Sequence, residues 1–290
     1  MVLKGEILMY NNENNLFEGI LLLSDLDGTL LDSKKDIPHR NLEAIKYFKD
    51  KGGLFTISTG RCPSSAKNIA LKAGVNCSAV TLNGALVYDY EKDEAVIRHT
   101  LPDGYKHLIK KIYDAFPQIG IQVYIESNIF VLRSNDVIDK FFIIEKQPYI
   151  NINFENLPNN SNKILIGGSH EMLLKVREYV EHLDMAGMYG MFTDPTYYEI
   201  LPANVNKGNS ALKVAEVYKV KPNNTVAIGD YFNDIDLLKS VGYPITTDNA
   251  PKEIKTYANF IAGHCDNGAV ADAIEHIERL VRRKGCMPKV

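Results

Sequence analysis

The chain has 290 residues, of which 45% are hydrophobic and 24% are charged, and its formal net charge is −3. This composition is typical of a globular protein with one large domain or two smaller ones. The near-neutral charge gives no basic surface for nucleic acid, and no apolar run is long enough to span a membrane.

The N-terminal part alternates short apolar strands with amphipathic helices. In the first helical segment Leu42, Ile45 and Phe48 fall on one face, and the glycine at 52 ends the pattern. We expect strands at Ile20–Ser24, Leu54–Ser58 and Ala79–Leu82, and helices at Pro38–Lys51 and Pro63–Ala73.

The middle of the chain, about residues 86 to 195, mixes helices with hairpins. We expect helices at Gly104–Phe116, Val137–Lys146 and Glu171–Leu183, and a strand at Lys163–Gly167. Two hairpins are also expected. They pair Ile121–Glu126 with Ile129–Arg133 through Ser127-Asn128, and Met188–Thr193 with Tyr197–Leu201 through Asp194-Pro195.

The C-terminal part resumes the alternation, with strands expected at Thr225–Ile228, Tyr243–Thr246 and Phe260–Ala262, and helices at Gly208–Tyr218, Asp234–Ser240, Pro251–Tyr257 and Ala269–Arg283. Repeated strand–helix units predict a mostly parallel sheet covered on both faces. The predicted fold class is α/β, with a Rossmann-like doubly wound parallel-sheet core at 1–85 and 196–290. An α+β cap at 86–195 is inserted into it.

Four polar groups lie next to these predicted core elements. They are Asp25 with Asp27, Ser58-Thr59-Gly60-Arg61, Asn206-Lys207-Gly208, and the run from Gly229 to Asp234. Open α/β sheets bind ligands beyond the carboxyl ends of their strands, so we expect these groups to meet in one site. An acidic turn after a strand is common by itself, and the other three groups favour the catalytic interpretation.

These residue types suit phosphoryl transfer. Thr59 and Lys207 can supply the hydrogen bond and the positive charge that a phosphate needs. Carboxylates that converge on an anionic substrate would repel it unless a cation lies between them. Mg²⁺ prefers oxygen ligands and often takes one or two carboxylates, so Asp25 and Asp230 are the natural pair. The sequence contains no GxxxxGK[ST] phosphate loop.

With these motifs in order, the chain resembles a Cof-type phosphatase of the haloacid dehalogenase superfamily from about Ile20 to Ala273. Asn83-Gly84-Ala85, Glu199-Ile200-Leu201-Pro202 and Asp248-Asn249-Ala250 also match, and the insertion has the size of that group's cap. The resemblance implies Mg²⁺-dependent hydrolysis of a small phosphomonoester, such as a sugar phosphate, a nucleotide or a cofactor phosphate, through an aspartyl-phosphate.

The resemblance also implies the catalytic roles. Asp25 would be the nucleophile and a metal ligand. Asp27 would protonate the leaving oxygen and then activate water, and its backbone carbonyl would bind the metal. Thr59 would hydrogen-bond the transferring phosphoryl group, and Lys207 would neutralise its charge and hold Asp25.

The remaining implied roles concern the metal and the substrate. Asp230 would complete the protein ligands of the metal, and Asp234 would act on metal-bound water or on Lys207. Asn233 would contact phosphate or metal-bound water. Arg61 and Asn83 are expected to contact the substrate, although Arg61 could instead pair with a carboxylate and Asn83 could only shape a turn.

Two other functions remain open from the sequence. A phosphotransferase or phosphomutase would use the same core and pass the phosphoryl group to a second hydroxyl instead of water. A phospho-aspartate switch without turnover also needs a strand-end aspartate. Asp27 and the large cap argue against the switch, because a switch needs neither a leaving-group acid nor a lid over a substrate.

The cysteines and the N-terminus bear on the compartment. The cysteines at 62, 77, 265 and 286 have neither metal-ligand spacing nor a dense disulfide pattern, so a reduced cytoplasm is the simplest location. We expect Cys62, which follows Arg61, to be a passive thiol. Residues 1–18 lack a signal-peptide pattern. The expected partner is a small phosphorylated metabolite, with no nucleic acid, no membrane and no obligate protein partner.

Overall fold

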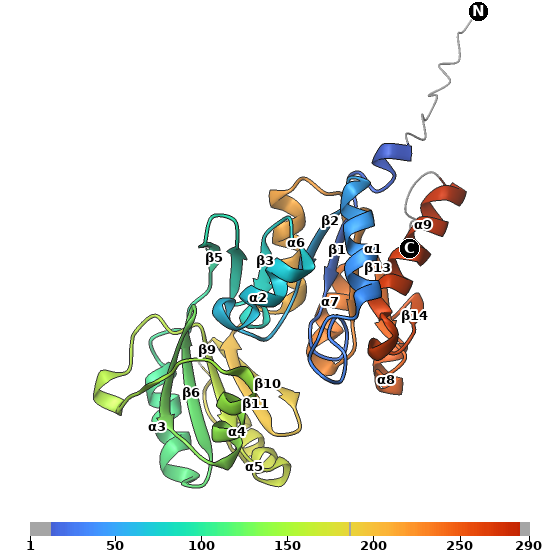
Figure 1. The fold of residues 1–290 in the computed structure, drawn as a ribbon. Helices are drawn as coiled ribbons and strands as arrows, with labels where there is room; N and C mark the ends of the chain where they lie inside the picture. Colours follow the sequence, from blue (N-terminus) through green and yellow to red (C-terminus); the bar gives the residue numbers. More distant parts are fainter. Residues whose placement is uncertain (1–12, 186, 285–290) are drawn as a thin grey trace, which may run out of the picture.

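A computed structural model describes residues 13–185 and 187–284 and contains two lobes (Figure 1). We call the lobe built on the five-stranded sheet the core and the lobe built on the six-stranded sheet the cap. The expectations for residues 1–12 and for Cys286 lie outside the described residues. None of the helices within the described ranges is long and apolar enough to cross a membrane.

The core sheet is parallel, with the strand order β14-β13-β12-β1-β2. Its strands are β1 Leu21–Ser24, β2 Leu54–Ile57, β12 Thr225–Gly229, β13 Tyr243–Thr247 and β14 Phe260–Ala262. From β1 the chain adds strands in one direction, and from β12 it adds them in the other. The reversal between β1 and β12 leaves a crevice at their carboxyl ends, where such sheets bind ligands.

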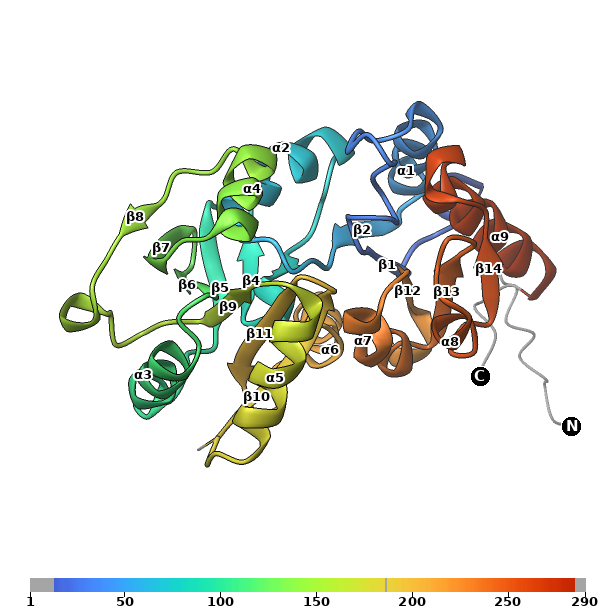
Figure 2. The same ribbon diagram turned by 90° about the horizontal axis from the view of Figure 1, so that it is seen from below.

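Helices cover both faces of this sheet, and Figure 2 shows α1 on one side of it and α6 and α7 on the other. Leu22 of β1 packs into the cluster that includes residues of α1 and α9. Leu21 and Leu23 point the other way and pack with residues of α6 and α7. This arrangement confirms the predicted α/β class. The helices are α1 His39–Asp50, α2 Pro63–Ala73, α6 Lys207–Val217, α7 Ile235–Ser240, α8 Lys252–Lys255 and α9 Ala269–Lys284.

A small antiparallel sheet, β3-β4-β5, extends the core beside β2. Its strands are β3 Ala79–Thr81, β4 Leu86–Asp89 and β5 Glu94–Arg98. A single parallel bridge between Ser58 and Val80 links it to the end of β2. Strands β4 and β5 were not expected from the sequence, because they form an antiparallel hairpin that interrupts the strand–helix alternation by which the core strands were identified.

The cap sheet has the order β10-β11-β9-β6-β7-β8 and is antiparallel except for the β7–β8 pair. Ile164 and Ile166 pack with α3 and α5 on the face away from the core. On the other face, the Ile138 side chain of α4 lies so close that a Cβ on Gly120 would come within 2.2 Å of it. The elements are β6 Gly120–Ile125, β7 Asn128–Arg133, β8 Ile150–Asn151, β9 Lys163–Gly167, β10 Met188–Asp194, β11 Tyr197–Pro202, α3 Tyr105–Ala115, α4 Asp136–Glu145 and α5 His170–Glu181.

Both predicted hairpins are confirmed, but each turn is displaced by one residue. The first turn lies one residue earlier than expected, and the second lies one residue later. Ile125 pairs with Asn128, so the first turn is Glu126-Ser127, with Glu126 at φ +52°. Asp194 pairs with Tyr197, so the second turn is Pro195-Thr196. In the second turn the Asp194 carboxylate accepts hydrogen bonds from the backbone and hydroxyl of Thr196, which explains why the aspartate ends the strand and does not enter the turn.

The expected boundaries between core and cap, 85/86 and 195/196, each fall inside a sheet. The small β3-β4-β5 sheet continues past the first boundary, and the cap sheet continues past the second. Strands β4 and β5 pair with β3 on the core side, whereas β11 continues in the cap sheet to Pro202. We propose that the chain crosses between the lobes at residues 99–101 and 203–206.

Gly84 generates a test of the fold. It has φ +101°, and a Cβ there would lie 2.3 Å from the backbone oxygen of Asn206. We expect Gly84→Ala to lower the free energy of unfolding by about 2–4 kcal/mol, because it adds backbone strain and a clash with backbone. Urea unfolding measures it.

The matched control is Gly168→Ala. A Cβ on Gly168 would make an ordinary contact of 3.4 Å with Leu173, so its effect should stay within about 1 kcal/mol. Equal stabilities of the two variants would contradict the role given to Gly84.

Candidate active site

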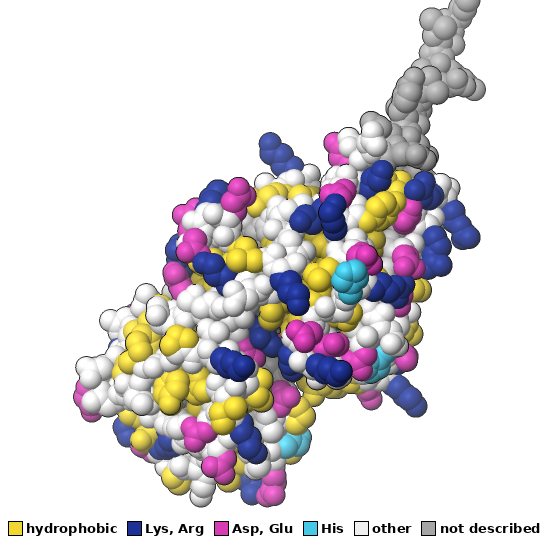
Figure 3. Space-filling model, viewed as in Figure 1, with side chains coloured by type: hydrophobic (Ala, Val, Ile, Leu, Met, Phe, Trp, Pro, Cys, Tyr) yellow, Lys and Arg dark blue, Asp and Glu magenta, His cyan; other side chains and the backbone are white. Residues whose placement is uncertain are grey.

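A cavity of about 800 Å³ lies between core and cap at the carboxyl ends of β1, β2 and β12. Acidic and basic side chains gather where the two lobes meet (Figure 3). Six predicted site residues line the cavity, namely Asp25, Asp27, Thr59, Arg61, Asp230 and Asn233. The other three predicted site residues lie just outside the cavity and bond residues that line it. Lys207 donates to Asp25, Asp234 accepts from the backbone nitrogen of Asp230, and Asn83 accepts from Asn233.

Lys207 joins two buried carboxylates. Its Nζ donates to Oδ1 of Asp25 at 2.5 Å and to Oδ1 of Asp234 at 2.6 Å. Lys207 begins α6, where the helix dipole disfavours a cation. Burial by itself would lower the pKa of Lys207, but Asp234 and Asp25 raise it above its ordinary value. The two carboxylates therefore keep the lysine charged inside the protein.

Asp25 and Asp230 are buried beside one another. Carboxylate oxygens of Asp25, Asp230 and Asp234 all lie within 4.8 Å of each other. Burial raises the pKa of Asp25 well above its ordinary range, with Asp234 and Asp230 adding to the rise and Lys207 opposing it. Burial, and next the charge of Asp234, raises the pKa of Asp230 to about 7. Three ionised carboxylates would exceed the single positive charge of Lys207, so the metal-free cluster favours the uptake of a proton or a cation.

The turn after β1 packs closely against the Asp230 side chain. Asp230 Oδ1 accepts a hydrogen bond from Thr29 Oγ1 at 2.7 Å. Gly28 has φ +83°, and a Cβ there would lie 2.5 Å from Asp230 Oδ2. Asp234 fixes the other side of this group, because its Oδ2 accepts from the backbone nitrogens of Asp230 and Tyr231 at 3.0 and 3.2 Å.

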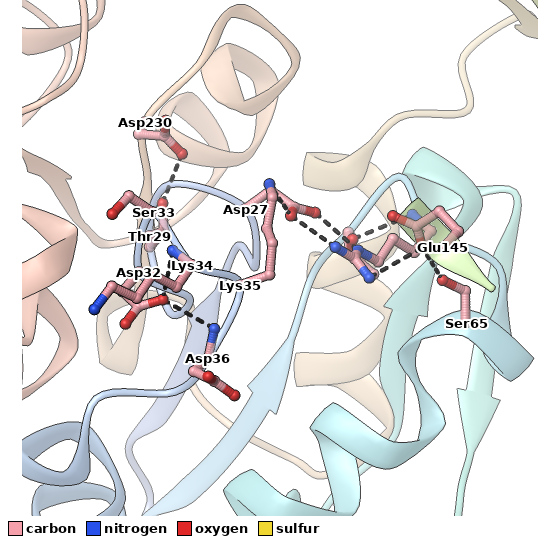
Figure 4. Close-up of polar contacts among 12 residues, drawn as sticks. Asp27, Thr29, Asp32, Ser33, Lys34, Lys35, Asp36, Ser65, Glu145 and Asp230 are labelled. Atoms are coloured by element: carbon pink, nitrogen blue, oxygen red, sulfur yellow. Dashed lines mark hydrogen bonds and ion pairs between the residues drawn. The ribbon is translucent and has the colours of Figure 1, made fainter. Parts of the chain in front are cut away.

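Asp27 is held by two cations. Arg61 donates to it through Nε at 2.8 Å and Nη2 at 2.7 Å, and Lys35 Nζ donates at 2.7 Å. Burial alone would raise the pKa of Asp27, but Arg61 and then Lys35 lower it below its ordinary value. Figure 4 shows Lys35 reaching Asp27 from a loop in which the Asp32 carboxylate accepts hydrogen bonds from the backbone nitrogens of residues 34 and 36.

Thr59 and Asn83 occupy the ends of β2 and β3. Thr59 is buried, and its Oγ1 accepts from the backbone nitrogen of Arg61 at 3.1 Å. Asn83 has φ +53°, an uncommon conformation that aims its amide at two neighbours. It donates to Glu199 at 2.7 Å and accepts from Asn233 at 3.3 Å. These contacts tie the end of β3 to the cap, and a contact of Asn83 with substrate stays a prediction.

Several residues that line the cavity were not predicted from sequence. Lys163 is buried and donates to Glu199 Oε1 and to the backbone oxygen of Gly60, both at 2.9 Å. Tyr197 lines the cavity, whereas its neighbour Tyr198 packs in the cap. Other unpredicted lining residues are Lys35, Tyr124, Phe141 and Glu145.

Signals for a few of these residues were present. Glu199 belongs to a matched motif without an assigned role, and period-two alternation puts Lys163, Leu165, Tyr197 and Glu199 on the strand faces that point to the core. Cys62 is 2% exposed and also lines the cavity, and its passivity stays a prediction.

The comparisons with known proteins agree with this geometry. The family model described as haloacid dehalogenase-like hydrolase matches residues 22–274. The chain belongs to the haloacid dehalogenase-like hydrolases. The resemblance read from the motifs is confirmed, and so are the fold class and the enzyme class, a phosphoric monoester hydrolase.

Named relatives of this haloacid dehalogenase-like hydrolase are phosphatases. It is 27% identical to 5-amino-6-(5-phospho-D-ribitylamino)uracil phosphatase YwtE of Bacillus subtilis, over 87% of this chain and 96% of the relative. It is 25% identical to an HMP-PP phosphatase of Serratia proteamaculans, over 87% of this chain and 93% of that one.

A solved structure supports the fold. A haloacid dehalogenase-like hydrolase from Bacteroides thetaiotaomicron superposes with a TM-score of 0.80 at 24% identity. The match covers 89% of this chain and 99% of the other.

The buried triad of Lys207, Asp25 and Asp234 gives a second prediction. Lys207→Met removes the cation between Asp25 and Asp234, and loss of one partner of a buried ion pair costs about 3–5 kcal/mol. Urea unfolding at neutral pH in the presence of a chelator measures this loss.

The control lies in the same helix. Lys213 pairs with Glu216 in solvent, so Lys213→Met should change the free energy of unfolding by less than about 1 kcal/mol. Adding Asp234→Asn to Lys207→Met should recover part of the loss, because one uncompensated carboxylate disappears. A double variant no more stable than the single one would contradict this account of the triad.

Proposed function

We propose that this protein is an Mg²⁺-dependent phosphatase that hydrolyses a small phosphomonoester through an aspartyl-phosphate on Asp25. The observation that carries the proposal is the placement of Asp25 at the cavity, held by Lys207, with Asp27 and Arg61 on the same wall. The residues proposed as nucleophile and proton-transfer group thus face one space, and the proposed cation, Lys207, bonds the nucleophile from behind.

The residues fit a hard divalent cation. Asp25 and Asp230 offer carboxylate oxygens, and a cation beside them would allow all three carboxylates of the cluster to ionise. We assign the metal to Asp25, Asp230 and the backbone carbonyl of Asp27. Both oxygens of Asp234 already accept hydrogen bonds, so we assign Asp234 to holding Lys207 and the Asp230 backbone. When bound, Mg²⁺ would supply positive charge to the phosphate and the carboxylates.

The chain's own residues would carry the two steps. Asp25 would attack phosphorus while the bond from phosphorus to the leaving oxygen breaks. Asp27 is ionised in the free protein, so it would take up a proton as the anionic substrate enters beside it and then give that proton to the leaving oxygen. Asp27 would then take a proton from water as the water oxygen attacks phosphorus and the bond to Asp25 breaks. Thr59 would hydrogen-bond the phosphoryl oxygens, and Lys207 would orient Asp25.

The substrate is a small phosphorylated metabolite in this proposal. The cavity volume is in the range of small-molecule sites, and its wall combines aromatic side chains with charged ones. The relatives' names, a phosphoribitylamino-uracil phosphatase and an HMP-PP phosphatase, support phosphorylated metabolites as a class. A sugar phosphate, a nucleotide or a cofactor phosphate would fit this class. The protein would act in the cytoplasm and without an obligate protein partner.

Asp25→Asn tests the nucleophile. Phosphate release from a panel of phosphomonoesters should require Mg²⁺, stop with a chelator, and fall at least about 1,000-fold in the variant, because the covalent route is lost. Asp103→Asn, an exposed change in the cap, should retain wild-type turnover. A folded wild-type protein that is silent across the panel would refute hydrolysis, and product formed only with an added acceptor would indicate a phosphotransferase.

The pKa of Asp230 predicts a pH dependence. Because it is raised to about 7, the metal-free protein holds a proton there that a cation must displace. Apparent Mg²⁺ affinity should therefore fall up to about tenfold per pH unit below pH 7.

The raised pKa of Asp230 also predicts how the stability of the metal-free protein depends on pH. The folded state binds this proton more tightly than the unfolded state, so the contribution to metal-free stability is lost as pH rises from about 4 to about 7.

Calorimetric titration with Mg²⁺ at pH 6, 7 and 8 measures the affinity. Asp230→Asn should bind more weakly and with a flatter profile, and a pH-independent wild type would contradict the assignment.

A further inference from the structure

Arg61 lies between two carboxylates that come from different lobes. Its Nε and Nη2 donate to Asp27 in the core, and its Nη1 donates to Glu145 in the cap at 3.0 Å. The arginine and glutamate side chains are only 14% and 11% exposed. Figure 4 shows the continuous line of contacts from Lys35 through Asp27 to Glu145 and Ser65. An ion pair so withdrawn from water matters more than a surface pair.

Local structure does not explain why Glu145 is buried. It is the last residue of α4, where the helix dipole disfavours a negative charge. The two residues before it, Ile143 and Ile144, are 72% and 61% exposed, so the carboxylate at the helix end is more buried than the apolar side chains beside it.

The contacts of Glu145 come from the core. Besides Arg61, its Oε2 accepts a hydrogen bond from Ser65, in the first turn of α2. One cap carboxylate oxygen therefore bonds two core residues, and both bonds require the cap to be closed on the core.

We propose that Glu145 is a positioning residue for the reaction: with the cap closed it fixes the Arg61 guanidinium and, through it, the Asp27 carboxylate. This inference rests on the proposed function. The guanidinium is planar, so a bond at Nη1 sets the direction of the Nε–Nη2 edge that grips Asp27. Without Glu145 that edge can swing, and Asp27, which carries its proton only with the anionic substrate bound beside it, loses its fixed place relative to the leaving oxygen.

The dependence on the leaving group distinguishes positioning from structural support. An alkoxide must be protonated as it leaves, whereas 4-nitrophenolate is a weak base that leaves with little help from an acid. A misplaced Asp27 should therefore slow alkyl esters selectively. A cap that is merely loosened should slow both kinds of ester alike.

The experiment compares Glu145→Gln with the wild-type full-length chain. Substrates are 4-nitrophenyl phosphate and the most active alkyl phosphomonoester of the panel above. We expect kcat and kcat/KM for the alkyl ester to fall roughly 10- to 100-fold together, and those for the aryl ester to fall less than about threefold. Because Glu145 acts through Arg61, adding Glu145→Gln to Arg61→Lys should cost little more than Arg61→Lys alone.

Glu171→Gln is the matched control, because Glu171 forms an exposed pair with Lys175 in the same cap. It should leave both substrates unchanged. Equal losses for the two esters in Glu145→Gln, or no loss for either, would overturn the inference while the phosphatase proposal stands. A wild-type protein inactive on both esters would instead refute the proposed function. If circular dichroism finds Glu145→Gln unfolded, Glu145→Asp, which keeps the charge but is one methylene shorter, should give the same selective pattern.

Discussion

The candidate site depends on the burial of like charges around a single lysine. Asp25 and Asp234 both bond Lys207, and Asp230 lies within reach of both carboxylates. Withdrawing these groups from water is unfavourable and is only partly offset by one cation. The sheet supplies the rigidity that this requires, because β1 and β12 are fully buried and bring their carboxyl ends together.

The cap contributes through the alternation of its strands. One set of side chains in β9 and β11 builds the cap's own core, and the alternate set, which includes Lys163, Tyr197 and Glu199, faces the cavity. The strands that stabilise the cap therefore also form the ceiling of the site. A change on the inner face can alter what enters the cavity without removing a residue from the cap's core.

The sequence predicted what depends on local pattern. The βα alternation, the two hairpins and the segment Pro63–Ala73 follow from periodicity and turn residues, and Asp25, Thr59 and Asp230 follow from their positions at strand ends. Lys35 and Glu145 could not be found this way, since one acts from a loop and the other from a helix end. Strands β4 and β5 were missed because their hairpin interrupts the strand–helix alternation. The second hairpin turn was displaced because Asp194 ends a strand and caps the turn with its own carboxylate.

The pairing of β1 with β12 has a consequence for folding. These central strands are neighbours in the sheet, with Leu21 opposite Thr225, yet the whole cap lies between them in the chain. During synthesis the edge of β1 that will receive β12 therefore stays unpaired until the cap has been made. An unpaired edge next to apolar leucines is prone to associate with other chains. The six cap strands, in contrast, all come from residues 120 to 202, so the cap sheet can complete its pairing before β12 has been made.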